Sequence, residues 1–257
     1  MLRSGVSAVR RSALSRGTRD VLTEYGSGWS SYRETLASSD TLEQWLCIEN
    51  LDEREDWFYV DGELTYRRFN SSNFYRQTLA QTLRSQLATA ESITEYGCGI
   101  GRNLLYLKKL FPNLRCYGYE LTPDGVDIAR QAAAKFALDI EYAQLDYVFD
   151  PPEKFVFPVT DAAFTMFSLE QLPTGCDIAL GNILSHVRYG SIHLEPIPEY
   201  YPKTLRGMIA RLDHRKAGYL GGFPAAVERQ NLKTVSRQRA TSAHNPLMFP
   251  SVIVLHK

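Results

Sequence analysis

A glycine-rich turn between a predicted strand and a predicted helix constrains the fold of this chain more than any other feature. Residues 92–96 form a short strand candidate, and the sequence then runs Gly97-Cys98-Gly99-Ile100-Gly101 before an apolar stretch with helical spacing. Glycine lets the backbone turn tightly and approach a ligand closely. In open parallel sheets such a turn lies at the carboxyl ends of the strands, where ligands bind. The turn therefore predicts an α/β domain with a ligand site at that edge.

Strand and helix patterns alternate after this turn. Further strands are predicted over 115–121, 140–145, 162–168 and 191–196, with helices over 123–138, 177–187 and 204–212. Such alternation implies right-handed βαβ units and a parallel sheet. Two β-rich runs at the end, 232–242 and 251–257, are separated only by a turn-like stretch and should pair antiparallel. The sequence predicts a doubly wound, mostly parallel seven-stranded sheet with one antiparallel strand near the C-terminus.

The N-terminal region has a different composition. Residues 20–64 are rich in aromatic and charged side chains, and 41–51 has the spacing of a short amphipathic helix. We expect residues 1–69 to form a tail and a helical, aromatic lid segment, and residues 70–257 to form the main domain. Residues 1–19 contain five arginines and no acid. An organellar transit peptide, a mobile basic tail and a docked helical extension all fit that composition.

The charge balance and the cysteines limit the partners. The chain has 29 basic and 29 acidic side chains and so lacks the overall positive charge typical of nucleic-acid binders. No apolar run reaches the roughly 18 residues that span a bilayer. The four cysteines form no C-x-x-C pair, as expected of reduced thiols in the cytosol. We expect a cytoplasmic protein that acts on a small molecule, without nucleic-acid or membrane partners; a homodimer stays open.

An acidic residue lies at or near the end of each of the first three predicted strands. Glu95 stands two residues before the first glycine, Glu120 ends the second strand and Asp146 follows the third. A carboxylate at the end of the second strand can accept both ribose hydroxyls of an adenosine group. The third glycine, Gly101, comes one residue earlier than in the dinucleotide fingerprint, and Arg102 takes the fingerprint position. That spacing disfavours a nicotinamide-dependent oxidoreductase, which stays as an alternative.

With these motifs, residues 70–257 resemble the class I S-adenosylmethionine-dependent methyltransferase family. Residues 95–101 resemble its first motif, 117–121 its acidic motif, 144–147 its adenine-contacting loop and 165–173 the strand-four motif beside the transferred methyl group. The predicted reversed strand also matches that family's sheet. Cys98 departs from the alanine or serine that the family often has there. These motifs are specific to the cofactor and the fold, and they identify no substrate.

The resemblance implies S-adenosyl-L-methionine as the cofactor. The glycine turn would hold its methionine part, Glu120 the ribose, and Leu121 and Asp146 the adenine. The methionine carboxylate needs a cation, for which Arg67, Arg68 and Arg76 lie upstream; a solvated face is the alternative for them. The predicted cofactor-binding residues are Glu95, Tyr96, Gly97, Cys98, Gly99, Gly101, Asn103, Glu120, Leu121, Asp146, Tyr147, Phe167 and Arg76.

Methyl transfer to an oxygen or to a protonated amine also needs a base. The base should lie near the carboxyl ends of strands four and five. Glu170 follows strand four, and His193 and Glu195 lie two residues apart on strand five, hence on one face. A core role for His193 and a strand-end role for Glu195 are the alternatives. No cluster of side chains has the pattern of a metal site, so metal-independent transfer is expected.

The sequence therefore predicts an enzyme that transfers a methyl group from S-adenosylmethionine to an oxygen or nitrogen atom of a small organic molecule, in a setting such as specialised metabolism. A protein or peptide methyltransferase is one alternative. A cofactor-binding partner subunit without activity is another. Neither the substrate nor the acceptor atom follows from the sequence, because fold and cofactor motifs do not specify them.

Overall fold

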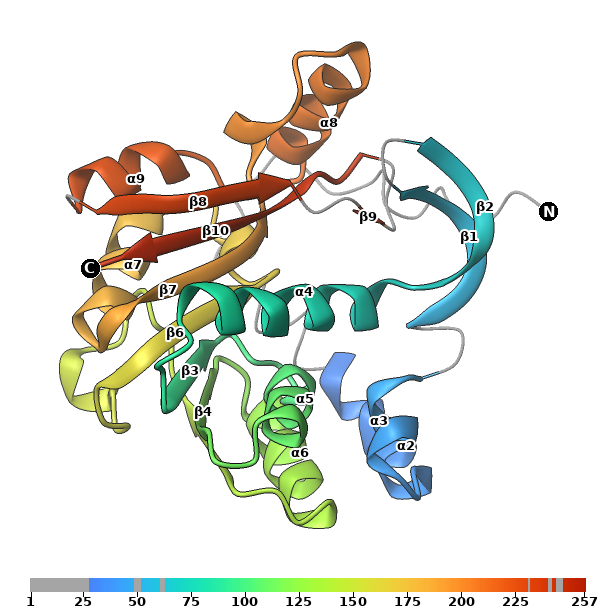
Figure 1. The fold of residues 1–257 in the computed structure, drawn as a ribbon, viewed down its shortest axis with the longest axis vertical. Helices are drawn as coiled ribbons and strands as arrows, with labels where there is room; N and C mark the ends of the chain where they lie inside the picture. Colours follow the sequence, from blue (N-terminus) through green and yellow to red (C-terminus); the bar gives the residue numbers. More distant parts are fainter. Residues whose placement is uncertain (1–27, 49–51, 61–62, 231, 240–241, 244–246) are drawn as a thin grey trace.

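A seven-stranded sheet forms the centre of the protein (Figure 1). The computed structural model describes residues 28–48, 52–60, 63–230, 232–239, 242–243 and 247–257, so the predictions for residues 1–19 lie outside the described residues. The strand order is β5-β4-β3-β6-β7-β10-β8. The strands of this sheet are β3 (Ser92–Tyr96), β4 (Arg115–Glu120), β5 (Ile140–Gln144), β6 (Thr160–Met166), β7 (Val187–Pro196), β8 (Lys233–Arg239) and β10 (Pro250–His256).

The strand directions confirm the predicted sheet. The pairs from β5 through β7 are parallel, whereas β10 runs antiparallel to both of its neighbours, β7 and β8. The first strand, the glycine turn and the following helix lie where their local patterns predict them. The strand predicted over 191–196 is longer, since β7 already begins at Val187. Helix α9 (Phe223–Arg229), for which we predicted no helix, precedes β8.

Helices cover both faces of the sheet, as a doubly wound fold requires. One face packs against α4 (Ser71–Gln86), α5 (Arg102–Leu110) and α6 (Pro123–Lys135), and the other against α7 (Cys176–Ser185) and α9. The alternation along β10 shows this division: Val252 and Val254 join the first core, while Ile253 and Leu255 join the second. A strand that is buried on both faces reads as a continuous apolar run.

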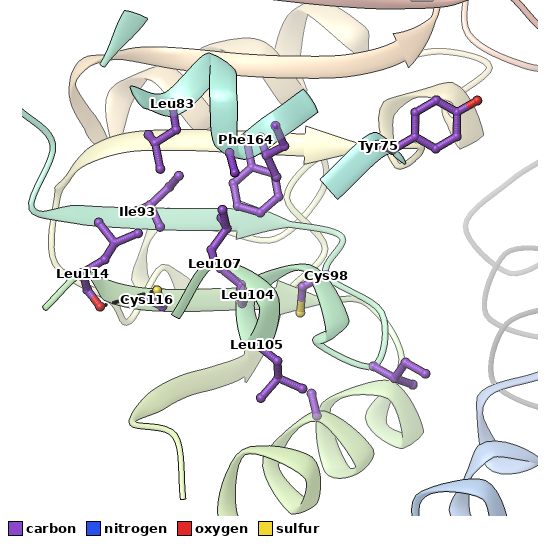
Figure 2. Packing of buried hydrophobic residues seen from close by; sticks show 14 of the residues in the cluster. Tyr75, Leu83, Ile93, Cys98, Leu104, Leu105, Leu107, Leu114, Cys116 and Phe164 are labelled. Carbon is purple, nitrogen blue, oxygen red and sulfur yellow. Dashed lines mark hydrogen bonds between the residues drawn. The ribbon is translucent and has the colours of Figure 1, made fainter. Parts of the chain in front are cut away.

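The core beneath the glycine turn is closely packed. Figure 2 shows Ile93 of β3 and Phe164 of β6 facing Leu104 and Leu107 of α5, with Leu83 of α4 beside them. Each of these side chains is at most 4% exposed. Full burial of one such side chain contributes about 1.5–3 kcal/mol to stability. This packing holds the start of α5 against the end of β3 and so fixes the turn between them.

The N-terminal region differs from the helical lid that we predicted. Its described residues form two short helices and then an antiparallel hairpin, which pairs with a short strand from the C-terminal region. These elements are α2 (Tyr32–Ser38), α3 (Leu42–Leu46), β1 (Glu53–Val60), β2 (Glu63–Asn70) and β9 (Ser242–Ala243). We did not predict the hairpin of β1 and β2 from the sequence, because charged residues interrupt the apolar pattern of its strands. Helix α4 begins after Asn70, whose side chain accepts a hydrogen bond from the Asn73 amide and caps the helix.

The remaining helix, α8 (Leu205–Lys216), lies between β7 and α9 and stands out from the body of the fold (Figure 1). Short 3-10 turns connect other elements: η2 (Pro152–Lys154), η3 (Leu169–Gln171) and η4 (Pro198–Tyr200). Among the described residues, no helix is both long and apolar enough to cross a membrane. Within that same part of the chain, no group of three or more His, Cys, Asp and Glu side chains has the arrangement of a metal site.

Candidate active site

The glycine turn has a backbone that only glycine adopts easily. Gly97 and Gly99 have φ angles of 73° and 54°. A Cβ atom on Gly97 would lie 1.8 Å from the Oγ atom of Ser168, and one on Gly99 would lie 3.0 Å from a ring carbon of Trp29. Side chains at these two positions would therefore collide with their neighbours as well as strain the backbone. The turn exposes its backbone to a cavity that the following residues enclose.

Glu120 lies across from this turn, at the end of β4. Its carboxylate accepts hydrogen bonds from the Gly99 amide at 2.9 Å, the Thr122 amide at 3.0 Å and the Thr122 hydroxyl at 2.8 Å. The residue is 6% exposed, and burial raises the pKa of this carboxyl while the hydrogen bonds and a polar contact with Trp29 lower it. The carboxylate thus borders the cavity from a fixed position.

Glu95, the acid before the turn, lies behind the cavity wall rather than in it. It is fully buried, and Asn103 donates a hydrogen bond from Nδ2 to its Oε1 at 2.7 Å. Burial, with the nearby Glu120 carboxylate adding to it, raises the pKa of Glu95 well above its usual range. Asn103 itself lines the cavity. Tyr96 is also buried, and its ring packs between those of Tyr119 and Tyr147.

Two arginines provide positive charge on the side of the cavity nearest α4 and α5. The Arg76 Nη1 and Arg102 Nη2 atoms both donate to the Leu46 carbonyl, at 2.8 and 2.7 Å. Both side chains also face the buried Asp52 carboxylate, which pairs closely with Arg102 and lies 3.9 Å from Arg76. Burial, together with the charge of Arg102, lowers the pKa of Arg76 to about 10. Two guanidinium groups opposite one carboxylate leave this wall positive.

The loop after β5 forms the opposite wall. The Asp146 carboxylate accepts hydrogen bonds from the amides of Val148 at 3.0 Å and Phe149 at 3.1 Å, which shapes the loop. Asp146, Leu121 and Tyr147, three of the predicted cofactor-binding residues, all line the cavity. The Tyr147 hydroxyl lies 2.9 Å from the Ser168 Oγ and so joins this loop to the one after β6.

The loop after β6 carries Phe167, Glu170 and Gln171 into the cavity. Phe167 has a φ angle of 55°, which is costly for a residue with a side chain and marks this turn as constrained. Its ring packs at 4.9 Å from the ring of Tyr75 on α4. Gln171 donates a hydrogen bond from Nε2 to the Glu170 Oε1 at 2.9 Å. These polar groups lie together beside two aromatic rings.

His193 and Glu195 do not reach this cavity. His193 is fully buried, with its ring nitrogens 3.0 Å from the Thr165 hydroxyl and 2.8 Å from the Ser191 hydroxyl. Burial lowers the pKa of its ring to about 3. Glu195 is equally buried and accepts hydrogen bonds from the amides of residues 168, 169 and 170, at 3.1, 3.1 and 3.2 Å. The expectation that these two side chains contact a substrate therefore does not fit their geometry, because the sheet encloses both.

Together these elements enclose a cavity of about 440 Å³. Of the predicted residues, Gly97, Cys98, Gly99, Asn103, Glu120, Leu121, Asp146, Tyr147, Phe167, Arg76 and Glu170 line it; Glu95, Tyr96, Gly101, His193 and Glu195 do not. Arg67 and Arg68 lie exposed on β2. Several other lining residues were not among the predicted site residues, including Trp29, Tyr32, Ser72, Arg102 and Gln171. Two of these carried a sequence signal: Arg102 directly follows the third glycine, and Gln171 lies within the 165–173 motif.

Comparisons with known proteins agree with this geometry. A family model described as a methyltransferase domain matches residues 93–190. Magnesium protoporphyrin IX methyltransferase from Synechocystis with bound SAH superposes with a TM-score of 0.61 at 12% identity, covering 94% of this chain and 100% of that one. Mitomycin 7-O-methyltransferase gives 0.55 at 15% identity, covering 73% of this chain and 55% of its own. Among curated proteins no sequence matches.

Residues 93–190 match a methyltransferase domain, and the chain has the fold of solved S-adenosylmethionine-dependent methyltransferases. The matched segment contains the glycine turn, Glu120, Asp146 and the loop after β6, and the solved structures share the sheet around them. A third structure of this fold, an O-methyltransferase from a Brevibacillus brevis polyketide synthase with bound S-adenosyl-L-homocysteine, gives a TM-score of 0.54 at 11% identity. It covers 71% of this chain and 71% of that one.

The residues of the methyltransferase domain fit its cofactor. The fixed carboxylate of Glu120 borders the cavity and can accept the hydroxyls of a ribose. The positive wall formed by Arg76 and Arg102 suits a carboxylate. At the turn, Gly97 and Gly99 line the cavity with backbone that carries no side chain. The ribose and the carboxylate of S-adenosylmethionine thus each have a matching group in the chain.

Proposed function

We propose that this enzyme transfers a methyl group from S-adenosylmethionine to an oxygen or nitrogen atom of a small organic molecule. The observation that carries the proposal is the Glu170–Gln171 pair, which lines the cavity next to Phe167 and Tyr75. A carboxylate and an amide in an aromatic surrounding suit an acceptor that has both a ring or chain to bury and a hydroxyl or amine to orient.

In the described part of the chain, the side-chain amide of Gln171 has a hydrogen-bond partner for its nitrogen but not for its oxygen. Its Nε2 must face the Glu170 carboxylate, which only accepts hydrogen bonds, so its Oε1 faces the other way. Among the residues that the structure describes, no donor pairs with that Oε1, although Gln171 is only 8% exposed. An enclosed acceptor of this kind costs stability unless a bound molecule donates to it. We assign it the O–H or N–H group of the methyl acceptor.

The cofactor supplies an electrophilic methyl group on a sulfonium when it is bound. The residues of this chain then bind and orient the acceptor, which supplies much of the rate acceleration. Gln171 holds the acceptor's O–H or N–H group, and the Glu170 carboxylate takes its proton as the new bond to carbon forms. Tyr75 and Phe167 cover this end of the cavity and exclude water. Burial, with the Glu170 charge adding to it, raises the pKa of Tyr75, so its hydroxyl keeps its proton.

The solved structures of this fold support a small acceptor. Those with TM-scores above 0.5 include methyltransferases whose names specify magnesium protoporphyrin IX, mitomycin and geranyl diphosphate. The neutral charge of the chain also disfavours a nucleic acid.

The proposal is tested by combining the purified chain with S-adenosylmethionine and a panel of small phenols, alcohols, carboxylic acids and amines, and measuring S-adenosylhomocysteine formation. We expect turnover with acceptors that carry an O–H or N–H group, and none with the same compounds already methylated at that atom. Cofactor binding without turnover of any small acceptor, combined with methylation of a peptide library, would contradict the proposal.

A further inference from the structure

Helix α8 has the reverse of the usual polarity of a surface helix. Its inner face consists of the buried residues Gly207, Ala210 and His214, which are small or polar. Its outer face presents large apolar side chains at the spacing i, i+3, i+4 and i+7. These are Leu205, Met208, Ile209 and Leu212, which are 71%, 51%, 45% and 56% exposed. Single exposed apolar residues are common on protein surfaces, whereas a continuous apolar stripe of this kind indicates an interaction surface.

Polar contacts fix this orientation of the helix. The Gly207 amide donates to the capping Thr204 hydroxyl at 3.2 Å, and a Cβ atom on Gly207 would lie 2.0 Å from the Pro202 carbonyl oxygen. On the same inner face, His214 lies 3.2 Å from the Tyr201 hydroxyl and 2.8 Å from the Leu220 carbonyl. Rotating the helix to bury Leu205 or Leu212 would break all of these contacts. The apolar stripe therefore stays outward.

The stripe has positive charge around it. Residues 203–216 contain five lysines and arginines and a single acid, in a chain that is neutral as a whole. Two of the five are engaged within the protein: Arg206 lies over the Phe249 ring at 4.1 Å, and Arg211 donates to the Pro198 carbonyl at 3.0 Å. The other three, Lys203, Arg215 and Lys216, are exposed beside the stripe, as is the acid, Asp213.

We propose that α8 docks on an anionic lipid surface, with its apolar stripe in the boundary between headgroups and acyl chains. An interfacial helix of this type combines an apolar face with lysines and arginines whose charged ends reach the phosphates. Such a helix lies in the plane of the membrane, so the absence of a spanning segment among the described residues does not oppose it. A second copy fits this face poorly, since a two-fold contact would bring the basic residues of both copies together.

The test is co-sedimentation of the full chain with phosphatidylcholine vesicles that contain or lack phosphatidylglycerol. We expect the chain to sediment with the anionic vesicles, more weakly with the neutral ones, and less at high salt. Met208→Ser combined with Leu212→Ser should weaken binding at least about tenfold, because each removes a buried apolar side chain. Arg215→Gln combined with Lys216→Gln should weaken binding to anionic vesicles by about fivefold per charge.

Matched controls separate the stripe from general surface effects. Ile178→Ser removes a side chain that is 50% exposed on α7, and Arg115→Gln removes an exposed charge at the start of β4; both should bind as the unmodified chain does. An unmodified chain that stays in the supernatant with anionic vesicles would overturn the proposal, as would binding that the α8 variants leave unchanged. Concentration-dependent self-association that the Met208/Leu212 variant abolishes, without vesicle binding, would assign this face to a second copy instead.

Discussion

The carboxylate of Glu120 accepts a hydrogen bond from the backbone amide of Gly99 at 2.9 Å. This bond joins the end of β4 to the turn after β3, and each residue thereby fixes the position of the other. Thr122, at the start of α6, holds the same carboxylate from its second side. A negative charge is thus held at the edge of the cavity before any ligand binds, which lowers the ordering cost of binding.

Removal of this carboxylate should weaken cofactor binding. Hydrogen bonds to a charged group contribute about 1.5–3 kcal/mol, so we expect Glu120→Ala to raise the dissociation constant for S-adenosylmethionine by roughly 10- to 100-fold. Isothermal titration calorimetry measures this change directly. Asp139→Ala, which removes an exposed acid just before β5, is the matched control and should bind normally. Equal affinities of the two variants would remove Glu120 from the binding site.

Trp29 should report cofactor binding through its fluorescence. Its indole ring packs against Gly99 and Gly125 and makes a polar contact with Glu120, so ribose hydroxyls that reach this carboxylate must change the surroundings of the ring. We expect the emission to change during titration with S-adenosylmethionine and the change to disappear in Trp29→Phe. Trp45, which is fully buried and does not line the cavity, provides the control: Trp45→Phe should keep the change. Loss of the change in Trp45→Phe alone would refute this role of Trp29.

Gly97→Ala should destabilise the fold through a defined collision. The new Cβ would lie 1.8 Å from the Ser168 Oγ, and the φ angle of 73° is strained for alanine. We expect a loss of about 2–4 kcal/mol in the free energy of unfolding, measured by urea denaturation. Ser168→Gly in the same chain removes the collision but not the strain, so part of the loss should return. Strictly additive effects of the two changes would show that no collision occurs.

The burial of His193 predicts a specific pH dependence of stability. Its pKa is lowered from 6.5 to about 3 by burial, so between these values the unfolded chain binds a proton there and the folded chain does not. Stability then falls as the pH falls, by about 1.4 kcal/mol per pH unit from this residue. His193→Gln should lose that contribution to the slope, as followed by urea unfolding from pH 6.5 to pH 4. His186→Gln, at the end of α7, controls for loss of any histidine, and an unchanged slope in His193→Gln would contradict the argument.

Glu170→Gln should lower turnover and leave cofactor affinity unchanged. Proton transfer to a positioned base accelerates such steps by about 10²–10⁴-fold, so we expect kcat to fall by a factor in that range once an acceptor is known. Because the neutral side chain still pairs with Gln171, the loop should keep its shape, which a thermal melt verifies. A fall in S-adenosylmethionine affinity with kcat unchanged would place Glu170 on the cofactor side instead.

The succession of strands and helices, the reversed strand and many cavity-lining residues were predictable from the sequence because each depends on local pattern. A short run before the glycines forms β3, the glycines specify the turn, Glu120 ends β4, and Asp146 comes two residues after β5. The carboxyl ends of parallel strands meet at one edge, so residues placed there by sequence are placed together in space. The same reasoning failed for the hairpin of β1 and β2, whose stability comes from pairing with each other and with β9.

Which side chains reach the cavity was decided by the tertiary structure alone. His193 lies on a strand that the sequence correctly identifies, yet neighbouring strands and Phe223 enclose its ring. Trp29 reaches the cavity from nearly a hundred residues before Glu120, and Gln171 faces it because Glu170 holds one end of its amide. Periodicity records the face of an element on which a residue lies. Periodicity does not predict what packs against that face, because those contacts join segments far apart in the chain.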